Sequence, residues 1–263
     1  MLWEIKMKLT GRTVLITGGS SGIGLALAEA LLARGNVVIV TGRRKEALEA
    51  AKRQHPDLHI YASDAADPDC IRNLHDTLIP RFPTLDTLVN NAGIMRALRL
   101  AEDRPLTEVT QEIDVDLSAP IQMVQQFLPH LRSRPEAMII NISSGLAFVP
   151  FTLSPIYSAA KAGIHAYTRC LRQQLRDTSA KVIEVAPPLT ETPLFETEFK
   201  QHMPDQSGMS VHQLVGHMIR GIEAGRDEIR PGQSKILKIA NRLVPKLIFQ
   251  QLARVGEPWV RQP

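Results

Sequence analysis

The sequence predicts an α/β protein built on one doubly wound parallel sheet with helices on both faces. The chain has 263 residues, enough for one large domain with a sizeable core. Short runs rich in β-branched residues alternate with longer helical patterns, which is the order of consecutive βαβ units. The strand-like runs are continuously apolar, as expected for strands buried on both faces of a parallel sheet.

The apolar runs give the expected strands in chain order. These are Val14 to Thr17, Val37 to Thr41, His59 to Ala62, Thr87 to Asn90, Met138 to Ser143, Lys181 to Ala186 and a short strand at Glu228 to Arg230. The expected helices are Gly22 to Arg34, Arg44 to His55, Pro68 to Phe82, Leu106 to Arg132, Ile156 to Arg176, Val211 to Ala224 and Ser234 to Val255. No repeat or Pro/Gly/Ser-rich linker divides the chain, so residues 1–263 are predicted to form a single domain.

The segment after Ala186 breaks the alternation and is our candidate substrate lid, at about residues 193–211. Its side chains give a mixed indication of the ligand. Phe195, Phe199, Met203 and Met209 favour an at least partly apolar ligand, whereas Glu196, Glu198 and Asp205 are acidic. A helical extension at about residues 234–256 follows.

Composition excludes several classes of protein. Two cysteines, Cys70 and Cys170, cannot form a disulfide framework, and we predict no metal site. No apolar run reaches the ~20 residues of a membrane span, and the N-terminus lacks a signal-peptide pattern, so we expect a cytoplasmic protein. The net charge of +4 is scattered without a base-reading motif, so no nucleic-acid partner is predicted and an anionic cofactor explains the excess as well.

A glycine-rich turn joins the first expected strand to the first expected helix. It reads Thr17-Gly18-Gly19-Ser20-Ser21-Gly22-Ile23-Gly24. Glycines permit a tight turn and let backbone N–H groups at a helix N-terminus approach a pyrophosphate. The spacing departs from G-x-G-x-x-G, and an ordinary glycine-rich turn is the alternative. The strand-turn-helix context favours a nucleotide site, whose candidate residues are Gly18, Ser20, Ser21, Gly22, Ile23 and Gly24.

The end of the second strand indicates which nucleotide binds. It reads Thr41-Gly42-Arg43-Arg44 and has no acidic residue, which an NAD enzyme usually offers to the adenosine ribose. An arginine at this point accommodates a 2′-phosphate instead. We therefore predict NADP(H), with NAD(H) still possible. The alternative is that Arg43 and Arg44 merely form a solvated helix start.

Tyr157 and Lys161 lie four residues apart near the start of a long helix and so share one face. A nearby ammonium favours the phenolate and lowers the pKa of a tyrosine, which fits the pair for proton transfer. Taken alone, the pattern is more often an exposed helix pair. Ser144 lies thirteen residues upstream of Tyr157, just past a buried strand, where it can hydrogen-bond the same substrate oxygen.

Together these elements resemble the short-chain dehydrogenase/reductase family over about residues 9 to 230. The further matching pieces are Asp64 with Ala65 near the adenine, Asn90-Asn91-Ala92-Gly93 after the fourth strand, and Pro187 to Thr192 as a partial match to the nicotinamide-contacting loop. The resemblance implies an NAD(P)-binding Rossmann-type sheet of about seven strands, a nicotinamide cofactor, and a homodimer or homotetramer.

The resemblance also implies the residue roles. Tyr157 is then the general acid or base, Lys161 lowers the pKa of Tyr157 and hydrogen-bonds the nicotinamide ribose, and Ser144 polarises the substrate carbonyl. Cofactor contacts are implied for Asn91, Ala92, Gly93, Pro187 and Thr192, as well as for Tyr157 and Lys161.

Two positions depart from the family pattern. Asp116, in Asp116-Leu117-Ser118-Ala119-Pro120, stands where the family usually has a fourth catalytic residue, an asparagine, and its charge would perturb Lys161 and Tyr157. Pro188 stands where the family usually has glycine, and it stiffens the loop beside the nicotinamide. In this loop the chain is similar to a branch exemplified by the oxidoreductase encoded with lipoteichoic-acid D-alanylation genes.

The predicted function is therefore an NADP(H)-dependent oxidoreductase that interconverts a small-molecule carbonyl and a secondary alcohol. The alternative, suggested by Asp116 and Pro188, is a cofactor-binding regulator or scaffold with weak catalysis. Turnover of carbonyl compounds with NADPH distinguishes the two.

The C-terminal stretch KILKIANRLVPKLIFQQLARV is amphipathic. Ile236, Ile239, Leu243, Leu247 and Ile248 recur at helical spacing, with Lys235, Lys238, Arg242 and Lys246 between them. We predict that this face packs on the chain's own core or on another subunit. Association with a membrane surface is the alternative, and Pro245 interrupts it.

Overall fold

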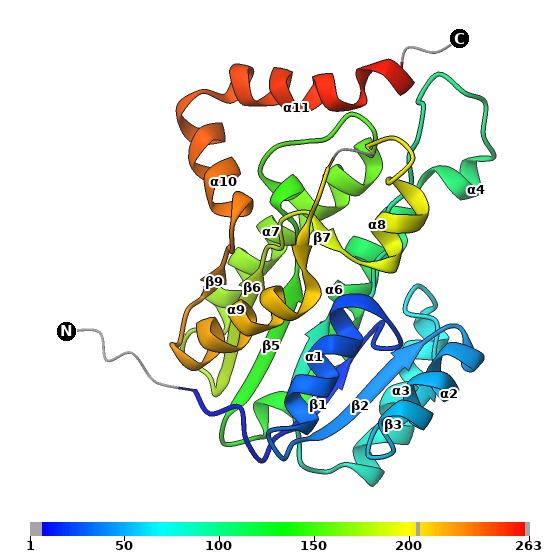
Figure 1. Cartoon of the computed structure of the whole chain (residues 1–263). Coiled ribbons are helices and arrows are strands. Elements are labelled where there is room, and N and C mark those ends of the chain that lie inside the picture. The colour runs from blue at the N-terminus through cyan, green and yellow to red at the C-terminus, as the bar shows by residue number, and fades with distance from the viewer. Residues whose placement is uncertain (1–6, 204–205, 261–263) are drawn as a thin grey trace.

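The computed structural model describes residues 7–203 and 206–260, and its centre is a seven-stranded parallel sheet. The strands are β1 (Thr13–Ile16), β2 (Val37–Gly42), β3 (His59–Ala62), β4 (Leu85–Asn90), β5 (Ala137–Ile142), β6 (Ala180–Val185) and β9 (Glu228–Ile229). Their order is β3-β2-β1-β4-β5-β6-β9, so the chain winds outward in one direction from β1 and in the other from β4 (Figure 1). The predicted fold class is confirmed, and the strand ends lie within two residues of the expected ones.

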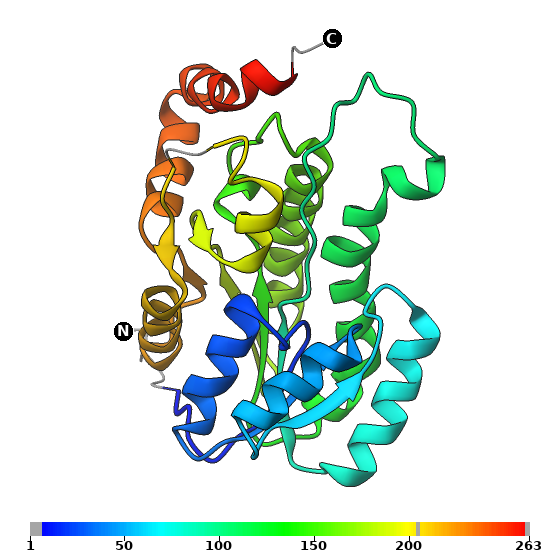
Figure 2. The same cartoon turned by 45° about the vertical axis from the view of Figure 1, so that its right-hand side comes forward.

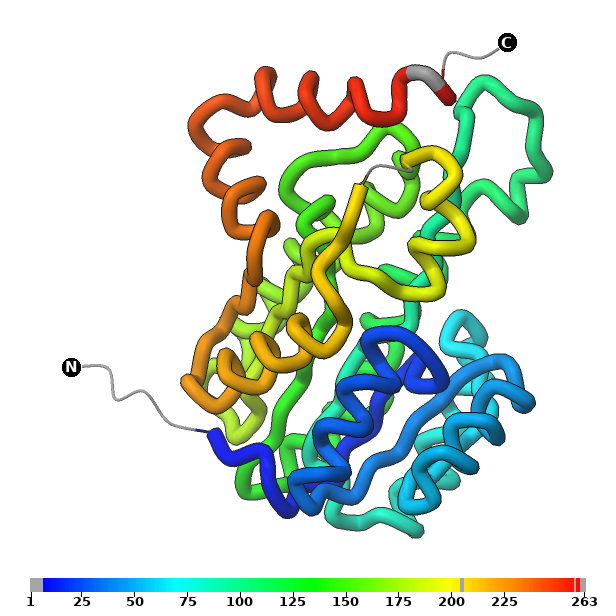
Figure 3. Tube along the Cα trace, in the orientation of Figure 1, coloured from blue at the N-terminus to red at the C-terminus, as the bar shows by residue number. Residues whose placement is uncertain are grey.

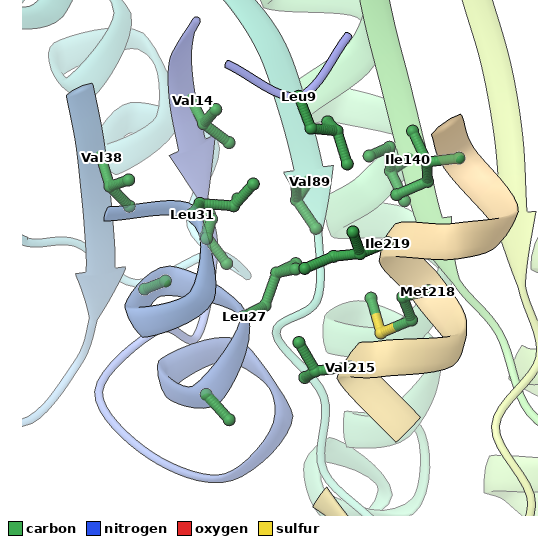
Figure 4. Close-up of a cluster of buried hydrophobic side chains, with 14 of the residues drawn as sticks. Leu9, Val14, Leu27, Leu31, Val38, Val89, Ile140, Val215, Met218 and Ile219 are labelled. Carbon is green, nitrogen blue, oxygen red and sulfur yellow. The ribbon is translucent and has the colours of Figure 1, made fainter. Parts of the chain in front are cut away.

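Helices cover both faces of the sheet (Figure 2). One face carries α1 (Gly22–Leu32), α2 (Lys45–Gln54) and α9 (Val211–Glu223), and the other carries α3 (Pro68–Arg81), α6 (Ala119–Arg132) and α7 (Pro155–Gln174). Each face of the sheet has its own hydrophobic core, and successive strand residues point into alternate cores. Val14 and Ile16 belong to the first core, on the side of α1, and Leu15 belongs to the second, on the side of α3. In Figure 4, Leu27 of α1 points toward Val215 and Ile219 of α9 across the first core.

Strand β3 lies at one edge of the sheet and is less buried than the inner strands. His59 and Ala62 are exposed and the two residues between them are half-buried. Burial on both faces is therefore wrong for this strand, which is the last strand on its side of the sheet in the described part of the chain.

The prediction of one continuous helix from Leu106 to Arg132 is wrong. The chain forms α4 (Leu106–Val109), α5 (Gln111–Ile113), the π-helical turn η1 (Asp114–Ser118) and then α6. A π turn inserts one extra residue into the helical ladder and shifts the faces that follow it. That turn carries Asp116, which is fully buried.

The C-terminal helix expected from Ser234 to Val255 is also interrupted. The structure has α10 (Gln233–Leu243) and α11 (Pro245–Val260), with Val244 between them in a non-helical conformation (φ −137°, ψ 59°). Pro245 causes the break, because its ring excludes the α conformation at the preceding residue and it has no N–H to donate. As Figure 3 shows, α11 then turns away from α10 and runs across one end of the molecule.

The lid and the residues directly before it contain regular structure that the sequence did not indicate. Two short strands, β7 (Thr190–Glu191) and β8 (Met209–Ser210), pair in parallel and bracket α8 (Pro193–Glu198). Thr192 caps α8 by accepting a hydrogen bond from the Phe195 N–H. Asp205, one of the acidic lid residues, lies outside the described residues. No helix in the described part of the chain is long and apolar enough to cross a membrane.

Candidate active site

A cavity of about 660 Å³ opens at the carboxyl ends of the strands. In an open parallel sheet this edge is where ligands bind, at the point where the chain reverses its winding between β1 and β4. One end of the cavity lies over β1 to β3 and the other under α8, α10 and α11.

The glycine-rich turn lines the first end of the cavity and has no room for a side chain at Gly18 or Gly19. Gly18 and Gly22 adopt positive φ angles of 64° and 56°. A Cβ on Gly18 would lie 2.8 Å from the Ala92 Cα atom, and one on Gly19 would lie 2.6 Å from the Val40 side chain. The first turn of α1 contains no acidic residue, and Ser21 makes no side-chain cap. Free N–H groups at this helix start therefore fit the pyrophosphate of a dinucleotide.

Asn91 and Thr17 hold the glycine turn against the end of β4. The Asn91 side-chain amide donates to the carbonyl oxygens of Thr17 at 2.9 Å and Gly18 at 3.0 Å. The Thr17 hydroxyl oxygen accepts from the backbone N–H groups of Asn91 and Ala92, both at 3.0 Å. These four bonds fix the relative position of two cavity walls, which explains why this amide and hydroxyl are needed there.

Arg43 and Arg44 line the cavity where β2 ends, with Asp64 and Ala65 opposite them at the end of β3. Asp64 accepts a hydrogen bond from the Ala66 N–H at 3.0 Å, which fixes the turn after β3. The lining residues from β2 and the turn after it are Thr41, Gly42, Arg43 and Arg44, so no carboxylate is present at this position. The charge at this wall is positive and fits a phosphate on the adenosine ribose.

Ser144, Tyr157 and Lys161 form the opposite wall. Ser144 follows β5, and its oxygen accepts from the Leu146 N–H at 3.1 Å. Tyr157 and Lys161 lie one turn apart on α7, with the Lys161 ammonium 5.3 Å from the centre of the Tyr157 ring. Lys161 is held by the Ile142 carbonyl oxygen at 3.1 Å. The predicted triad is thus brought together at one point of the cavity.

Competing effects act on the Tyr157 hydroxyl. Burial raises its pKa above 10.0 and is the largest effect. The charge of Lys161 and a hydrogen bond with Ser144 act in the lowering direction, whereas the Asp116 charge raises the pKa further. Lys161 therefore lowers the pKa as expected, but in this structure burial outweighs it. Such a tyrosine is protonated at neutral pH and is suited to donate a proton.

Asp116 forms a buried ion pair with Lys161. Its Oδ1 atom lies 3.1 Å from the Lys161 Nζ atom, and its Oδ2 accepts from the Ile94 N–H at 3.2 Å. Burial raises the pKa of Asp116 from 3.8 to about 6, against the lowering effect of Lys161. For Lys161, burial acts to lower the pKa, but the charges of Asp116 and Tyr157 raise it overall. A Cβ on Gly93 would lie 2.6 Å from the Asp116 Oδ1 atom, so a glycine is required beside this carboxylate.

The two prolines after β6 form the floor beside Ser144. The Pro187 carbonyl oxygen accepts from the Gly145 N–H at 2.8 Å, and the Pro188 carbonyl oxygen accepts from the Thr190 hydroxyl at 2.9 Å. Gly145 also contacts the start of α10, because a Cβ there would lie 2.8 Å from the Ser234 hydroxyl oxygen. The C-terminal extension therefore reaches the wall that contains Ser144.

Beyond Ser144 and Tyr157 the cavity is lined almost entirely by apolar side chains. They come from four separate parts of the chain: Met95, Leu146, Phe151, Leu189, Leu194, Phe195, Phe199, Met203, Leu237, Leu252 and Val255. Phe151, Phe195, Phe199 and Met203 also form a buried cluster of their own. Residues of the lid therefore form part of the wall at this end of the cavity.

Gly24 is the one predicted site residue that does not line the cavity. A Cβ there would lie 2.5 Å from the Asn91 amide nitrogen and from the Gly18 carbonyl oxygen, so Gly24 permits close packing beneath the turn. Sequence reasoning missed Met95, Leu237, Leu252 and Val255, because their positions depend on tertiary contacts. It also missed the buried ion pair of Arg96 and Glu112, for which the sequence carries no signal.

Comparison with known proteins gives the following similarities. The family model described as short chain dehydrogenase matches residues 12–203. The uncharacterised oxidoreductase DltE of Bacillus subtilis is 39% identical over 94% of this chain and 98% of its own length. A fatty acyl-CoA reductase of Acinetobacter baylyi is 31% identical over 80% of this chain and 73% of its own length. The structure of a short-chain dehydrogenase from Burkholderia cenocepacia in complex with NADP superposes with a TM-score of 0.81 at 24% identity, covering 94% of this chain and 99% of that one.

Proposed function

The chain belongs to the short-chain dehydrogenase/reductase family and is an oxidoreductase, and we propose that it interconverts an apolar carbonyl compound and the corresponding secondary alcohol with NADP(H). The observation that carries this proposal is the convergence of Ser144, Tyr157 and Lys161 on one cavity whose other end is a glycine-rich dinucleotide cradle.

The proposed chemistry assigns proton transfer to the side chains, while a bound nicotinamide supplies or accepts the hydride. In reduction, the Tyr157 hydroxyl donates its proton to the carbonyl oxygen as that oxygen becomes an alkoxide. Ser144 donates a hydrogen bond to the same oxygen and orients it. Lys161 favours the phenolate that remains on Tyr157, and its own charge is maintained by Asp116.

NADP(H) is preferred in this proposal because of the charge at the end of β2. Arg43 and Arg44 line the cavity, and no carboxylate from β2 is available to bind the ribose hydroxyls. A planar guanidinium pairs with a phosphate through two parallel hydrogen bonds, which adds both energy and geometric selection.

An apolar substrate is proposed because the lid end of the cavity offers few polar groups. The aromatic and aliphatic side chains that line it could bury a hydrocarbon chain or ring, and burial contributes about 0.8 kcal/mol for each CH₂ group. The activity of the acyl-CoA reductase relative agrees with a carbonyl joined to a long apolar chain.

The decisive test is Tyr157→Phe assayed on ketones of increasing chain length with NADPH. Loss of the hydroxyl should lower kcat by at least about 100-fold, the usual contribution of a general acid. NADPH binding, measured by fluorescence titration, should change little. For the wild type, kcat/KM should rise with the length of the apolar chain.

Tyr167→Phe is the matched control, because Tyr167 is half-buried on the same helix and does not line the cavity. It should retain full activity. Wild-type protein that binds NADPH but turns over none of the compounds would favour the regulator or scaffold instead. Full activity of Tyr157→Phe would contradict the mechanism.

A further inference from the structure

The helix pair α10–α11 exposes apolar side chains to an unusual degree. Of the eleven exposed large hydrophobic side chains among the described residues, seven belong to this pair and the residue between them. They are Ile236, Ile239, Leu243, Val244, Leu247, Phe249 and Val260. Single exposed apolar residues are ordinary on a protein surface, but a concentration of them marks a site of interaction.

Five of these side chains form a continuous stripe around the bend between the two helices. Ile236, Ile239 and Leu243 follow one face of α10, and Val244 with Leu247 continue the stripe around Pro245. Leu243 is 72% exposed and Ile236 is 64% exposed. The sequence predicted that this face packs on the chain's own core or on another subunit, and packing on the core is wrong for these residues. Of the apolar residues named for that face, Ile248 alone is half-buried, against a cluster that includes Phe148. The bend forms an outer corner of the molecule (Figure 1).

Basic side chains are interleaved with the apolar stripe. Lys235, Arg242, Lys246 and Arg254 are exposed and take part in none of the ion pairs found among the described residues. From Gly232 to Gly256 the sequence contains no acidic residue. The helix pair carries five basic residues and one acidic residue, Glu257, so its net charge of +4 equals that of the whole chain. The expectation that the excess is scattered along the chain is therefore wrong.

We propose that this docking face, formed by Ile236, Ile239, Leu243, Val244 and Leu247 with Lys235, Arg242, Lys246 and Arg254, binds the surface of an anionic lipid bilayer. Apolar side chains with lysines and arginines beside them are the pattern of helices that lie in the interfacial plane of a membrane. Negative lipid headgroups attract the cations, while the apolar side chains enter the boundary of the acyl chains.

A second copy of the chain is a poorer occupant of the docking face. A symmetric dimer centred on the stripe would place each cation near the same cations of the partner, because a two-fold interface pairs a surface with itself. No acidic residue on the stripe is available to compensate this repulsion. The charge pattern thus favours a negatively charged partner surface.

The opposite faces of the same helices line the substrate end of the cavity. Leu237 of α10 and Leu252 and Val255 of α11 point inward, next to the lid. Docking through the outer face would therefore hold the cavity beside the bilayer. The proposal does not depend on the catalytic activity, since binding is measured without substrate or cofactor.

The test is sedimentation of the full-length protein with vesicles of phosphatidylcholine alone or of phosphatidylcholine with phosphatidylglycerol. The wild type should partition onto the anionic vesicles at least tenfold more strongly, and high salt should weaken that binding. Leu243→Glu/Leu247→Glu should reduce it at least tenfold. Leu106→Glu is the matched control, since Leu106 is an exposed leucine, 86% accessible, on the separate helix α4.

Charge is tested separately with Lys235→Glu/Arg242→Glu/Lys246→Glu. Each basic residue near an anionic surface contributes about fivefold in binding, so reversing three should cost at least about 100-fold. The control triple Arg53→Glu/Arg132→Glu/Arg226→Glu changes the net charge equally at exposed sites elsewhere.

Equal loss of vesicle binding in both triple variants, or wild-type protein that stays in solution at every lipid concentration, overturns the proposal. So does a dimer in size-exclusion chromatography that Leu243→Glu/Leu247→Glu abolishes while vesicle binding is absent.

Discussion

At the scale of single residues, Asp116 is the position where this chain departs most from its family pattern. Asp116 and Lys161 are both buried and pair with each other. Asp116 also accepts a hydrogen bond from the Ile94 N–H, and Lys161 also donates one to the Ile142 carbonyl oxygen. Burying a charge is costly unless it is paired, so neither side chain is tolerated without its partner. The departure noticed in the sequence thus has a structural counterpart in the 3.1 Å ion pair.

The raised pKa of Asp116 predicts a specific pH dependence of stability. Its pKa is about 6 in the folded protein against 3.8 ordinarily, so between these values the folded state binds more protons than the unfolded state. The contribution of Asp116 to the free energy of unfolding is then largest at low pH and falls as pH rises through this window, by about 3 kcal/mol in total. In Asp116→Asn this fall is absent.

The measurement is urea unfolding of both proteins from pH 4.5 to 6.5. The stability of Asp116→Asn minus that of the wild type should increase steadily with pH. Asp114→Asn is the matched control, because Asp114 is exposed on the same π turn, and its difference from the wild type should stay flat. A flat difference for Asp116→Asn as well would mean that burial does not perturb this carboxyl group.

The sequence could predict those residues of the site that directly follow a strand. Ser144 and Arg43 lie just past buried strands, and parallel strands present their carboxyl ends at one edge. The same reasoning could not assign Gly24 to packing rather than to cofactor contact, because only the contact with Asn91 distinguishes the two.

At the scale of secondary-structure elements, an ion pair with the buried Glu112 helps to hold the segment from Gly93 to Arg99. Arg96 donates to Glu112 at 2.9 Å and to the Glu108 carbonyl oxygen at 2.7 Å. Glu112 is completely buried on α5, directly before the π turn that carries Asp116. The pair therefore connects the chain after β4 to the helix that positions the buried aspartate.

Removing one partner of this pair should destabilise the protein. Glu112→Ala should lower the free energy of unfolding by about 3 kcal/mol, since it leaves an uncompensated guanidinium in a partly buried site. The double variant Arg96→Met/Glu112→Leu should regain most of that loss, because apolar side chains of similar volume need no partner. Urea unfolding of Arg96→Met, Glu112→Leu and the double variant measures the coupling.

The exposed pair of Arg176 and Asp177 provides the comparison. Its side chains are 65% and 84% accessible, so Asp177→Ala should change stability by less than about 0.5 kcal/mol. A Glu112→Ala variant as stable as the wild type would show that the buried pair does not fix the segment.

The sequence predicted helices and strands correctly where the spacing of apolar residues and the length of the segment indicated the same element. It failed where a π turn or a proline interrupts that spacing. The pattern from Leu106 to Arg132 contains the π turn, which shifts the helical face by one residue without any proline or glycine to signal it. Pro245 did signal the break between α10 and α11, yet the continuing apolar pattern favoured a single helix. The short strands β7 and β8 have too few residues to show a period.

At the scale of the whole molecule, the cavity joins parts of the chain that are far apart in sequence. Its walls run from Gly18 in the first turn to Val255 in the last helix, and α8, α10 and α11 close its apolar end. Local patterns could predict the nucleotide end because it consists of strand termini. The apolar end depends on how the C-terminal extension folds back, which no local pattern encodes.

A ligand that contacts so many separated elements should stabilise the whole fold. Binding at 100 times the dissociation constant adds about 2.7 kcal/mol to the free energy of unfolding. In a protein of this size each kcal/mol raises Tm by about 2 to 4 °C, so saturating NADPH should raise it by about 5 to 10 °C. NADH at the same concentration should give a smaller shift, because it lacks the phosphate that Arg43 would bind.

Arg43→Ala should remove most of the difference between the two cofactors. A hydrogen bond to a charged group contributes about 1.5 to 3 kcal/mol, so its loss weakens NADPH binding by about tenfold or more and leaves NADH binding nearly unchanged. Arg53→Ala is the matched control, since Arg53 is exposed on α2 and does not line the cavity. Differential scanning fluorimetry of the three proteins with each cofactor gives the shifts. A wild-type shift that is equal for NADH and NADPH would mean that Arg43 belongs to a solvated helix start and does not select the phosphorylated cofactor.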